Sequence, residues 1–335
     1  MPWYDVKASQ YGTIIVNGYA YPFINQQVLE QWTSDLTYLS SFSYGFNENG
    51  DLVPLNDERI IQTAYQNGVA PLMVLTPLNE EGQFSNELAS SVLNNEGARN
   101  RLIDNIVNTI NEKDYYGVDF DFEFIFADDK DEYVQLVAGT AARLNPIGAV
   151  TLVALAPKTY AEQPGLLYEG HDYVGLGEAA NLALLMTYEW GYTYGPPMAV
   201  APINKVREVL DYGVSVIPNN KILMGIPNYG YDWTLPFVQG ESVAENLSNV
   251  EAVERAANVG ATIQFDEVAQ SPFYEYTDDQ GRQHVVWFED ARSMRAKLEL
   301  VNEYDLAGIS FWTVMDPFPV GSVVLNELFT VAKVE

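Results

Sequence analysis

The sequence contains no cysteine and only two histidines, His171 and His284, among its 335 residues. Without thiols the chain can form no disulfide, no thiolate nucleophile and no Cys-based zinc or iron–sulfur site. Two histidines are too few for most imidazole-rich metal sites or for a Ser-His hydrolase. We therefore expect no metal and no cofactor, with both histidines in surface or structural positions.

Positive charge and long apolar runs are also scarce. The chain has 17 Lys and Arg residues against 46 Asp and Glu residues, a net charge of −29. Because phosphates and anionic lipid surfaces attract basic side chains, nucleic acid and membrane partners are excluded. The longest apolar runs, Val150–Ala156 and Leu182–Met186, have the length of strands and not of membrane spans. The N-terminus, MPWYDVKAS, lacks the basic and apolar regions of a signal peptide, and none is expected.

Short apolar runs alternate with amphipathic stretches along the chain. The strand-like runs are Thr13–Val16, Tyr38–Phe42, Ala70–Leu75, Gly117–Glu123, Ala149–Leu155, Leu182–Tyr188, Lys221–Ile226 and Gly308–Trp312. The helix-like stretches between them include Asp57–Gln66, Ala98–Asn111, Asp131–Leu144 and Ile203–Tyr212. This alternation is typical of βαβ units in a parallel sheet. An open doubly wound sheet is the alternative, but no Gly-rich phosphate loop follows a strand. We predict an α/β protein, a (β/α)8 TIM barrel forming one domain over residues 1–335.

One interval departs from this pattern. About eighty residues separate the seventh and eighth runs, which is far more than a loop and a helix need. Within the interval, Ala261–Val268 and Gln283–Phe288 are predicted strands on either side of a turn at residues 277–281. The pattern predicts a small α+β insertion at about residues 234–295, on the catalytic face of the barrel.

The fourth strand-like run ends in three acids spaced two residues apart: Asp119, Asp121 and Glu123. Residues alternate sides along a strand, so the three acids share the face toward the barrel interior. Three buried carboxylates cannot all stay ionised cheaply, and their protonation must be coupled. We interpret them as catalytic, with Glu123 at the C-terminal end where barrel enzymes keep their active sites. The alternatives are an exposed edge strand and a divalent-metal site of Asp-x-Asp type.

The segment GVDFDFE (residues 117–123) resembles the DGxDxDxE signature of family 18 glycoside hydrolases, the chitinase-like enzymes. MTYE (186–189) resembles the motif that ends the family's sixth strand, and GISFW (308–312) resembles its eighth strand with a floor tryptophan. Two longer segments, 186–198 and 225–233, resemble the bacterial spore-cortex branch of YaaH- and SleL-type N-acetylglucosaminidases. Members of that branch usually carry N-terminal LysM modules, and none is visible in this sequence.

The resemblance implies retaining, substrate-assisted hydrolysis of β-1,4-linked N-acetylglucosamine glycans, with spore-cortex peptidoglycan fragments as the expected substrate. It implies that Glu123 is the general acid and base with a raised pKa, and that Asp121 orients the acetamido group of the substrate. Asp119 then shares a proton with Asp121, and the Tyr188 hydroxyl contacts the acetamido carbonyl. The implied substrate-binding residues are Trp312 as the floor of the −1 subsite, and Glu189, Tyr19, Tyr44, Asn228, Tyr229 and Trp233.

The resemblance further implies non-proline cis peptides at Ser41–Phe42 and Trp312–Thr313. Three positions depart from the family pattern: Tyr116 replaces an acid, Glu189 stands for Asp, and Tyr231 stands where many chitinases have Arg. The alternatives are a chitinase, an endo-β-N-acetylglucosaminidase on N-glycans, and a non-catalytic glycan-binding lectin. Such lectins typically lose the residue that corresponds to Glu123, which is present here. We expect a monomer whose partner is the glycan, in the spore coat, cortex or cell wall.

Overall fold

Eight parallel strands close into a barrel in the computed structural model, which describes residues 9–79 and 82–334. Their order around the barrel is β1-β14-β8-β7-β6-β5-β4-β2, and β2 pairs back onto β1. The strands are β1 (Thr13–Ala20), β2 (Tyr38–Phe46), β4 (Ala70–Leu75), β5 (Gly117–Phe120), β6 (Val150–Leu155), β7 (Leu182–Leu185), β8 (Ile222–Pro227) and β14 (Gly308–Trp312). The predicted (β/α)8 barrel is confirmed, and each strand overlaps the run that predicted it.

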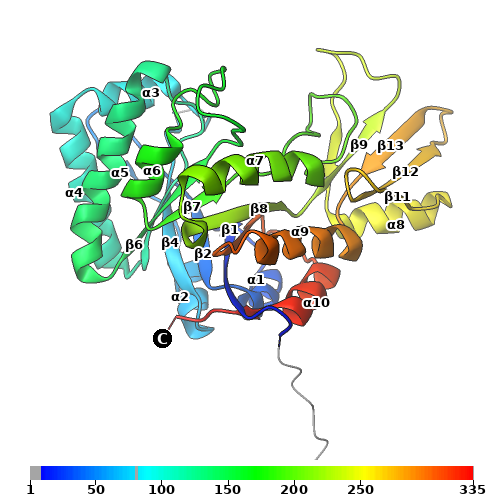
Figure 1. The fold of residues 1–335 in the computed structure, drawn as a ribbon, viewed down its shortest axis with the longest axis horizontal. Coiled ribbons are helices and arrows are strands. Elements are labelled where there is room, and N and C mark those ends of the chain that lie inside the picture. Colours follow the sequence, from blue (N-terminus) through cyan, green and yellow to red (C-terminus); the bar gives the residue numbers. More distant parts are fainter. Residues whose placement is uncertain (1–8, 80–81, 335) are drawn as a thin grey trace, which may run out of the picture.

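Helices surround these strands (Figure 1). They are α1 (Gln26–Trp32), α2 (Glu58–Gln66), α3 (Asn86–Leu93), α4 (Glu96–Lys113), α5 (Lys130–Leu144), α6 (Tyr173–Ala179), α7 (Ile203–Val216), α9 (Ala291–Glu303) and α10 (Pro319–Leu328). Short 3-10 helices lie at Thr33–Asp35, Ala127–Asp129, Asn145–Ile147 and Asn219–Lys221, and two-residue strands β3 (Leu52–Val53) and β15 (Thr330–Val331) extend the sheet. The Asn95 side chain caps α4 by accepting from the Ala98 N–H. No helix within the described ranges combines the length and hydropathy needed to cross a bilayer.

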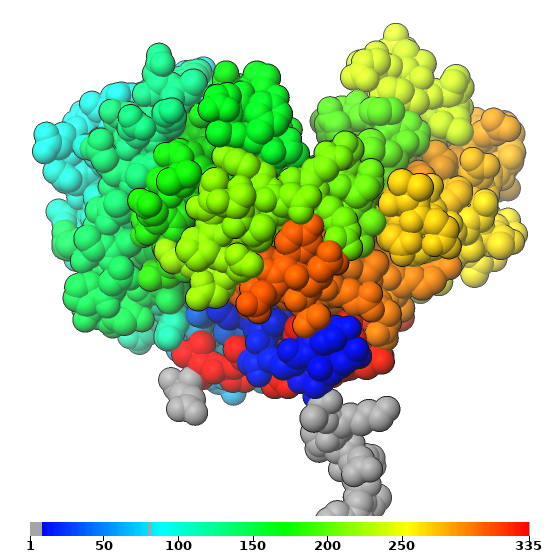
Figure 2. Space-filling view, in the orientation of Figure 1, coloured from blue at the N-terminus to red at the C-terminus, as the bar shows by residue number. Residues whose placement is uncertain are grey.

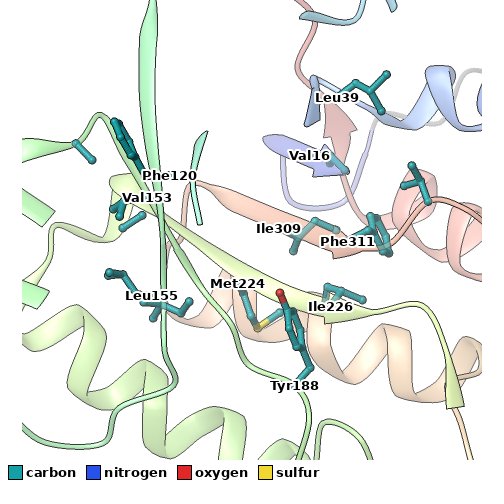
Figure 3. Close-up of a cluster of buried hydrophobic side chains, with 14 of the residues drawn as sticks. Val16, Leu39, Phe120, Val153, Leu155, Tyr188, Met224, Ile226, Ile309 and Phe311 are labelled. Atoms are coloured by element: carbon teal, nitrogen blue, oxygen red, sulfur yellow. The ribbon is translucent and has the colours of Figure 1, made fainter. Parts of the chain in front are cut away.

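Side chains of the barrel strands alternate between two hydrophobic cores. Leu152 and Ala154 of β6 belong to a cluster inside the barrel, whereas Val153 and Leu155 belong to the large cluster shared with the helices. Figure 3 shows several members of this helix-side cluster from different strands. On β5 the alternation places Phe120 in the helix-side cluster and the carboxylate of Asp119 inside the barrel, where Asp119 is paired in register with Leu152.

A second sheet and a helix follow β8. Its antiparallel order is β10-β9-β13-β12-β11, with β9 (Gly230–Thr234), β10 (Glu245–Leu247), β11 (Gln264–Asp266), β12 (Ser271–Thr277) and β13 (Gln283–Trp287). Helix α8 (Asn249–Val259), which starts with a capping box of Ser248 and Glu251, packs Ala252 and Ala256 on this sheet. Figure 1 shows the sheet and α8 together at one side of the barrel.

The insertion differs in detail from its prediction. It begins with β9 at Gly230, and the predicted end near residue 295 falls inside α9, which packs against α10. The strand predicted at Ala261–Val268 is shorter in the structure, where β11 covers Gln264–Asp266, and the hairpin partner of β13 is β12 and not this strand. No strand is predicted over β12, in which Pro272 is the second residue, near the start of the strand where proline is tolerated.

Candidate active site

The three acids lie at the C-terminal end of β5. The ladder with β4 and β6 ends at Phe120, three residues before the predicted strand end, although the Asp121 N–H still donates to Leu75 O at 3.0 Å. The alternation of faces continues past the ladder, because Phe122 packs in the helix-side core and stacks on Tyr133. Asp119 and Asp121 are 0% and 4% exposed, and Glu123 is less buried. The structure therefore stacks two buried aspartates below a glutamate that reaches solvent.

Asp119 is held by polar side chains from the bottom of the barrel. Ser40 Oγ lies 2.9 Å from both Asp119 Oδ2 and Asn17 Oδ1, and the Asn17 amide nitrogen donates to Ser310 Oγ at 3.0 Å. The single hydroxyl proton of Ser40 can go to only one acceptor, so a proton on Asp119 completes the chain of hydrogen bonds. Burial raises the pKa of Asp119 to about 6, against the lowering effect of the nearby Tyr19 hydroxyl and of the hydrogen bond from Ser40.

The remaining acids also have raised pKa values. Burial, followed by the charges of Glu123 and Asp119, raises the pKa of Asp121 well above that of a free aspartate. Burial and then the charge of Glu189 raise the pKa of Glu123 to about 7. The direction agrees with the expectation for Glu123, and both Glu189 and the coupled Asp121 are charged groups beside it. The acids titrate as one coupled group.

Two cavities meet at Glu123, and both are lined by Met186, Tyr188 and Glu189. The first, of about 310 Å³, is also lined by Tyr19, Asp121, Tyr231 and Trp312. The second, of about 150 Å³, is also lined by Pro157, Leu167, Tyr168 and Trp190. Figure 2 shows the surface notched between the green and the yellow-green parts of the molecule. A substrate bond placed at Glu123 would have one cavity on each side.

Aromatic side chains shape the first cavity. The Trp312 ring packs edge-on against Tyr19 and Phe42, with ring centroids 5.3 and 5.2 Å away. Tyr188 follows β7 and lies over Gly225 of β8, where a Cβ atom would stand 2.6 Å from the tyrosine ring. The peptide Trp312–Thr313 is cis, as expected. The second non-proline cis peptide is Phe42–Ser43, one residue after the predicted Ser41–Phe42.

Glu189 forms part of the wall between the two cavities. It has a φ of 67°, and its Oε1 accepts hydrogen bonds from the hydroxyls of Tyr229 and of Tyr231, the latter at 3.0 Å. Burial of the carboxylate raises the pKa of Glu189, and these two hydrogen bonds oppose the rise. Tyr229 thus contacts the site through Glu189, while Tyr231 itself lines the first cavity.

Four predicted binding residues do not line either cavity: Tyr229, which lies behind Glu189, and Tyr44, Trp233 and Asn228. Tyr44 donates to the buried Asp57 in the helix-side core, because the register of β2 shifts between Ser41 and Tyr44 and reverses the face of the residues that follow. Trp233 is buried and donates to Gly195 O at 2.8 Å. Asn228 donates to the carbonyls of residues 313 and 316 at 2.9 Å each, and so supports the loop after Trp312.

Sequence reasoning missed several lining residues. Met186 lies two positions before Tyr188, and the same alternation that placed Tyr188 on the site could have placed it there. Tyr168 and Leu167 lie on the long loop after β6, where no periodicity indicates which side chains face the cleft. Among the residues whose placement is described, no group of three or more His, Asp or Glu side chains is arranged to hold a metal ion.

Comparisons with known proteins agree with this site. The family model described as "Glycosyl hydrolases family 18" matches residues 79–316. The chain is 42% identical over 310 residues to the cortical fragment-lytic enzyme of Bacillus subtilis, covering 92% of this chain and 71% of that protein. It is 38% identical over 314 residues to the putative sporulation-specific glycosylase YdhD of the same organism, covering 93% and 74%.

Solved structures give the same result. The spore cortex-lytic enzyme SleL of Bacillus megaterium superposes with a TM-score of 0.93 at 39% identity, covering 98% of this chain and 76% of that one. The family model matches more than half of the chain. The chain belongs to glycosyl hydrolase family 18.

Proposed function

We propose that this chain is a retaining β-N-acetylglucosaminidase that uses the acetamido group of its substrate as the nucleophile. The observation that carries the proposal is the order of the acids from the barrel interior to the surface. Asp119 and Asp121 are buried, whereas Glu123 lines both cavities and has a pKa raised to about 7. A carboxylic acid with that pKa is half protonated near neutral pH and can serve as proton donor and then as base.

The first half of the reaction breaks the glycosidic bond. The Glu123 carboxyl proton goes to the glycosidic oxygen, which leaves C1 with the bonding electron pair. The acetamido carbonyl oxygen forms a bond to C1 and closes an oxazolinium ring. Asp121 accepts a hydrogen bond from the acetamido N–H, and the Tyr188 hydroxyl donates to the former carbonyl oxygen. Both contacts orient the nucleophile, and this gain comes from proximity.

The second half regenerates the enzyme. Glu123, now ionised, takes a proton from water, and the water oxygen attacks C1 from the face that the leaving group vacated. The bond between C1 and the acetamido oxygen breaks, so the product keeps the β configuration. Asp119 exchanges a proton with Asp121 as charge develops on the ring nitrogen, and Ser40 accepts or donates accordingly. Trp312 forms the floor under the −1 sugar.

The glycan class is proposed from the relatives. Proteins named for cortical fragment lysis and for sporulation cover most of this chain at 38–42% identity, whereas the chitinase structures among its neighbours are under 25% identical. We propose peptidoglycan fragments of the spore cortex as substrate, with chitin oligosaccharides as the second candidate, and the cortex or cell wall as the place of action. A lectin function is disfavoured, because Glu123 is present at the cavity rim.

Mass spectrometry of products tests the proposal. Wild-type protein and the Glu123→Gln variant are incubated separately with spore-cortex fragments, chitin oligosaccharides and an N-glycoprotein. We expect the wild type to release cortex products that end in N-acetylglucosamine, and the variant to be about 10²–10⁴-fold slower. Cleavage of the N-glycoprotein alone, or equal activity in both proteins, would contradict it.

A further inference from the structure

The peptide that precedes Glu123 is not held by the barrel ladder. The strand β5 ends at Phe120, and residues 121–126 belong to no helix or strand. The direction of the Glu123 side chain therefore depends on contacts made by these residues themselves. The Phe122 carbonyl, which belongs to the peptide bond leading into Glu123, is hydrogen-bonded to the imidazole of His171, with Nε2 2.8 Å from the oxygen.

The tautomer of His171 follows from its other nitrogen. The Ala156 N–H donates to Nδ1 at 2.7 Å, so Nδ1 carries no proton and acts as an acceptor. Nε2 must then carry the proton, and it donates to Phe122 O. His171 is 0% exposed, and burial lowers its pKa to about 4, which keeps the ring neutral and preserves both bonds at neutral pH.

The backbone of His171 is itself fixed. Its N–H donates to Tyr168 O at 3.1 Å, and its carbonyl accepts from the buried Lys158 Nζ at 3.0 Å. The preceding Gly170 lies so close to Ile125 that an added Cβ would stand 2.4 Å from the isoleucine Cβ. The imidazole therefore joins three segments: the end of β6 at Ala156, the loop that carries Tyr168 into the second cavity, and the peptide before Glu123.

We propose that His171 is a positioning residue for the general acid: its Nε2–H fixes the Phe122–Glu123 peptide and so the direction of the Glu123 carboxyl. The inference rests on the proposed role of Glu123. It assigns to a histidine, which sequence reasoning placed in a surface or structural setting, a role in the rate of proton transfer. A displacement of the acid by about 1 Å is enough to cost on the order of 100-fold in rate.

Two substitutions test the two hydrogen bonds of the His171 imidazole one at a time. In the His171→Asn variant the amide oxygen lies near the position of Nδ1, so the bond from Ala156 N–H can survive and the bond to Phe122 O is lost. In the His171→Gln variant the amide nitrogen reaches the position of Nε2, so the bond to Phe122 O can survive and the Ala156 N–H loses its acceptor. Each variant keeps one buried hydrogen bond, and we expect similar losses in thermal midpoint.

The activities are expected to differ. We expect the Gln variant to keep kcat within about fivefold of the wild type and the Asn variant to lose about tenfold or more, with little change in KM for either. His284→Asn, at the other histidine, is the matched control and should leave kcat unchanged. Equal kcat values in the two His171 variants, or a loss that follows thermal stability, would overturn the proposal. A wild type inactive on every N-acetylglucosamine glycan would instead overturn the proposed function.

A measurement on the unmodified protein covers the case in which either variant fails to fold. The chain has two histidines, so ¹⁵N-labelled imidazoles give two signal sets, which the His284→Asn variant assigns. We expect His171 as the neutral Nε2–H tautomer from pH 5.5 to 8, with its Nε2–H signal shifting when a thiazoline mimic of the intermediate binds. An Nδ1–H tautomer or a charged ring at neutral pH would contradict the proposal.

Discussion

Two sets of buried carboxylates in this protein differ in whether neighbouring groups compensate their charge. Asp57, under β2, accepts hydrogen bonds from Tyr44 and Tyr115 and pairs with Lys113. Asp119 and Asp121, inside the barrel, pair with no cation among the described residues, and each keeps one buried oxygen without a hydrogen-bond partner. Buried charge is normally compensated because leaving it unpaired is costly. The compensated carboxylate holds the fold together, and the uncompensated pair lies where the proposed chemistry takes place.

The insertion repeats the compensated arrangement. Asp232 on β9 accepts from Arg255 at 2.6 Å, from Tyr276 at 2.6 Å and lies 2.7 Å from His284 Nδ1. Every oxygen of this carboxylate has a partner, as at Asp57. Asp119 and Asp121 therefore differ from Asp57 and Asp232 in lacking a cationic partner within the described part of the chain; an unpartnered oxygen alone does not set them apart, because the buried Asp129 and Glu289 each keep one as well.

Among the variants that test this comparison, Asp121→Asn is expected to have the largest effect on activity. The Asp121→Asn variant cannot take part in proton sharing with Asp119, and we expect kcat to fall about 10²–10³-fold with KM within a few-fold, because the contact acts in the transition state. Steady-state kinetics on cortex fragments measure both constants. The control is Asp57→Asn, whose kcat should stay within about threefold. A large rise in KM without a fall in kcat would argue against the assigned role.

Substitutions in the two sets of acids, Asp57→Asn and Asp119→Asn, should affect stability differently. Asp57→Asn leaves Lys113 and two tyrosine hydroxyls without their acceptor and should cost about 2–4 kcal/mol of unfolding free energy. Asp119→Asn removes an uncompensated buried charge and should leave stability unchanged or higher. Urea unfolding measures both. Destabilisation of similar size in the two variants would remove the distinction between the two sets of acids.

The pH dependence of stability sharpens this contrast. The pKa of Asp119 is raised to about 6 in the folded state from a usual value near 3.8. The folded protein therefore binds the extra proton between these values, and this group makes the protein less stable as pH rises through that window. We expect the advantage of Asp119→Asn over the wild type to be larger at pH 7.5 than at pH 4. The measured quantity is the difference in unfolding free energy between the two proteins at each pH. It is needed because burial lowers the pKa of His171 to about 4, and this histidine changes stability in the opposite direction over the same pH range.

The alkaline limb of the pH–rate profile tests the electrostatic link between the two glutamates. Glu123 must be protonated to act as acid, so kcat/KM should fall above about pH 7. The Glu189→Gln variant removes a neighbouring negative charge, and the limb should move to lower pH. An unmoved limb would show that the charge of Glu189 does not act on Glu123.

The smallest expected effect is at Tyr44. The Tyr44→Phe variant removes one of the three partners of Asp57 and should cost about 1–2 kcal/mol, with kcat unchanged. Thermal unfolding and a standard activity assay are sufficient. A loss of activity without loss of stability would return Tyr44 to the substrate-binding residues.

The sequence predicts the barrel and its acids well, because buried parallel strands read as short apolar runs and an acid at every second position contradicts that pattern. The prediction from sequence fails where local geometry interrupts the alternation of side chains along a strand. The register shift in β2 turns Tyr44 away from the cleft, and β12, with Pro272 near its start, is not predicted. Tyr168 and His171 lie on or beside a loop without periodicity, so their contacts with the site depend on tertiary structure alone.

The most direct test of the account is the rate of a substrate whose −1 sugar carries an N-acyl group of weakened nucleophilicity. Replacing the acetyl methyl hydrogens by one, two and three fluorines withdraws electrons from the carbonyl oxygen and leaves the sugar ring and the leaving group unchanged. If the acetamido oxygen attacks C1, kcat falls steeply with each fluorine, and NMR of fresh product shows the β anomer first. A kcat that does not depend on fluorination, or an initial α anomer, would contradict substrate assistance at this site.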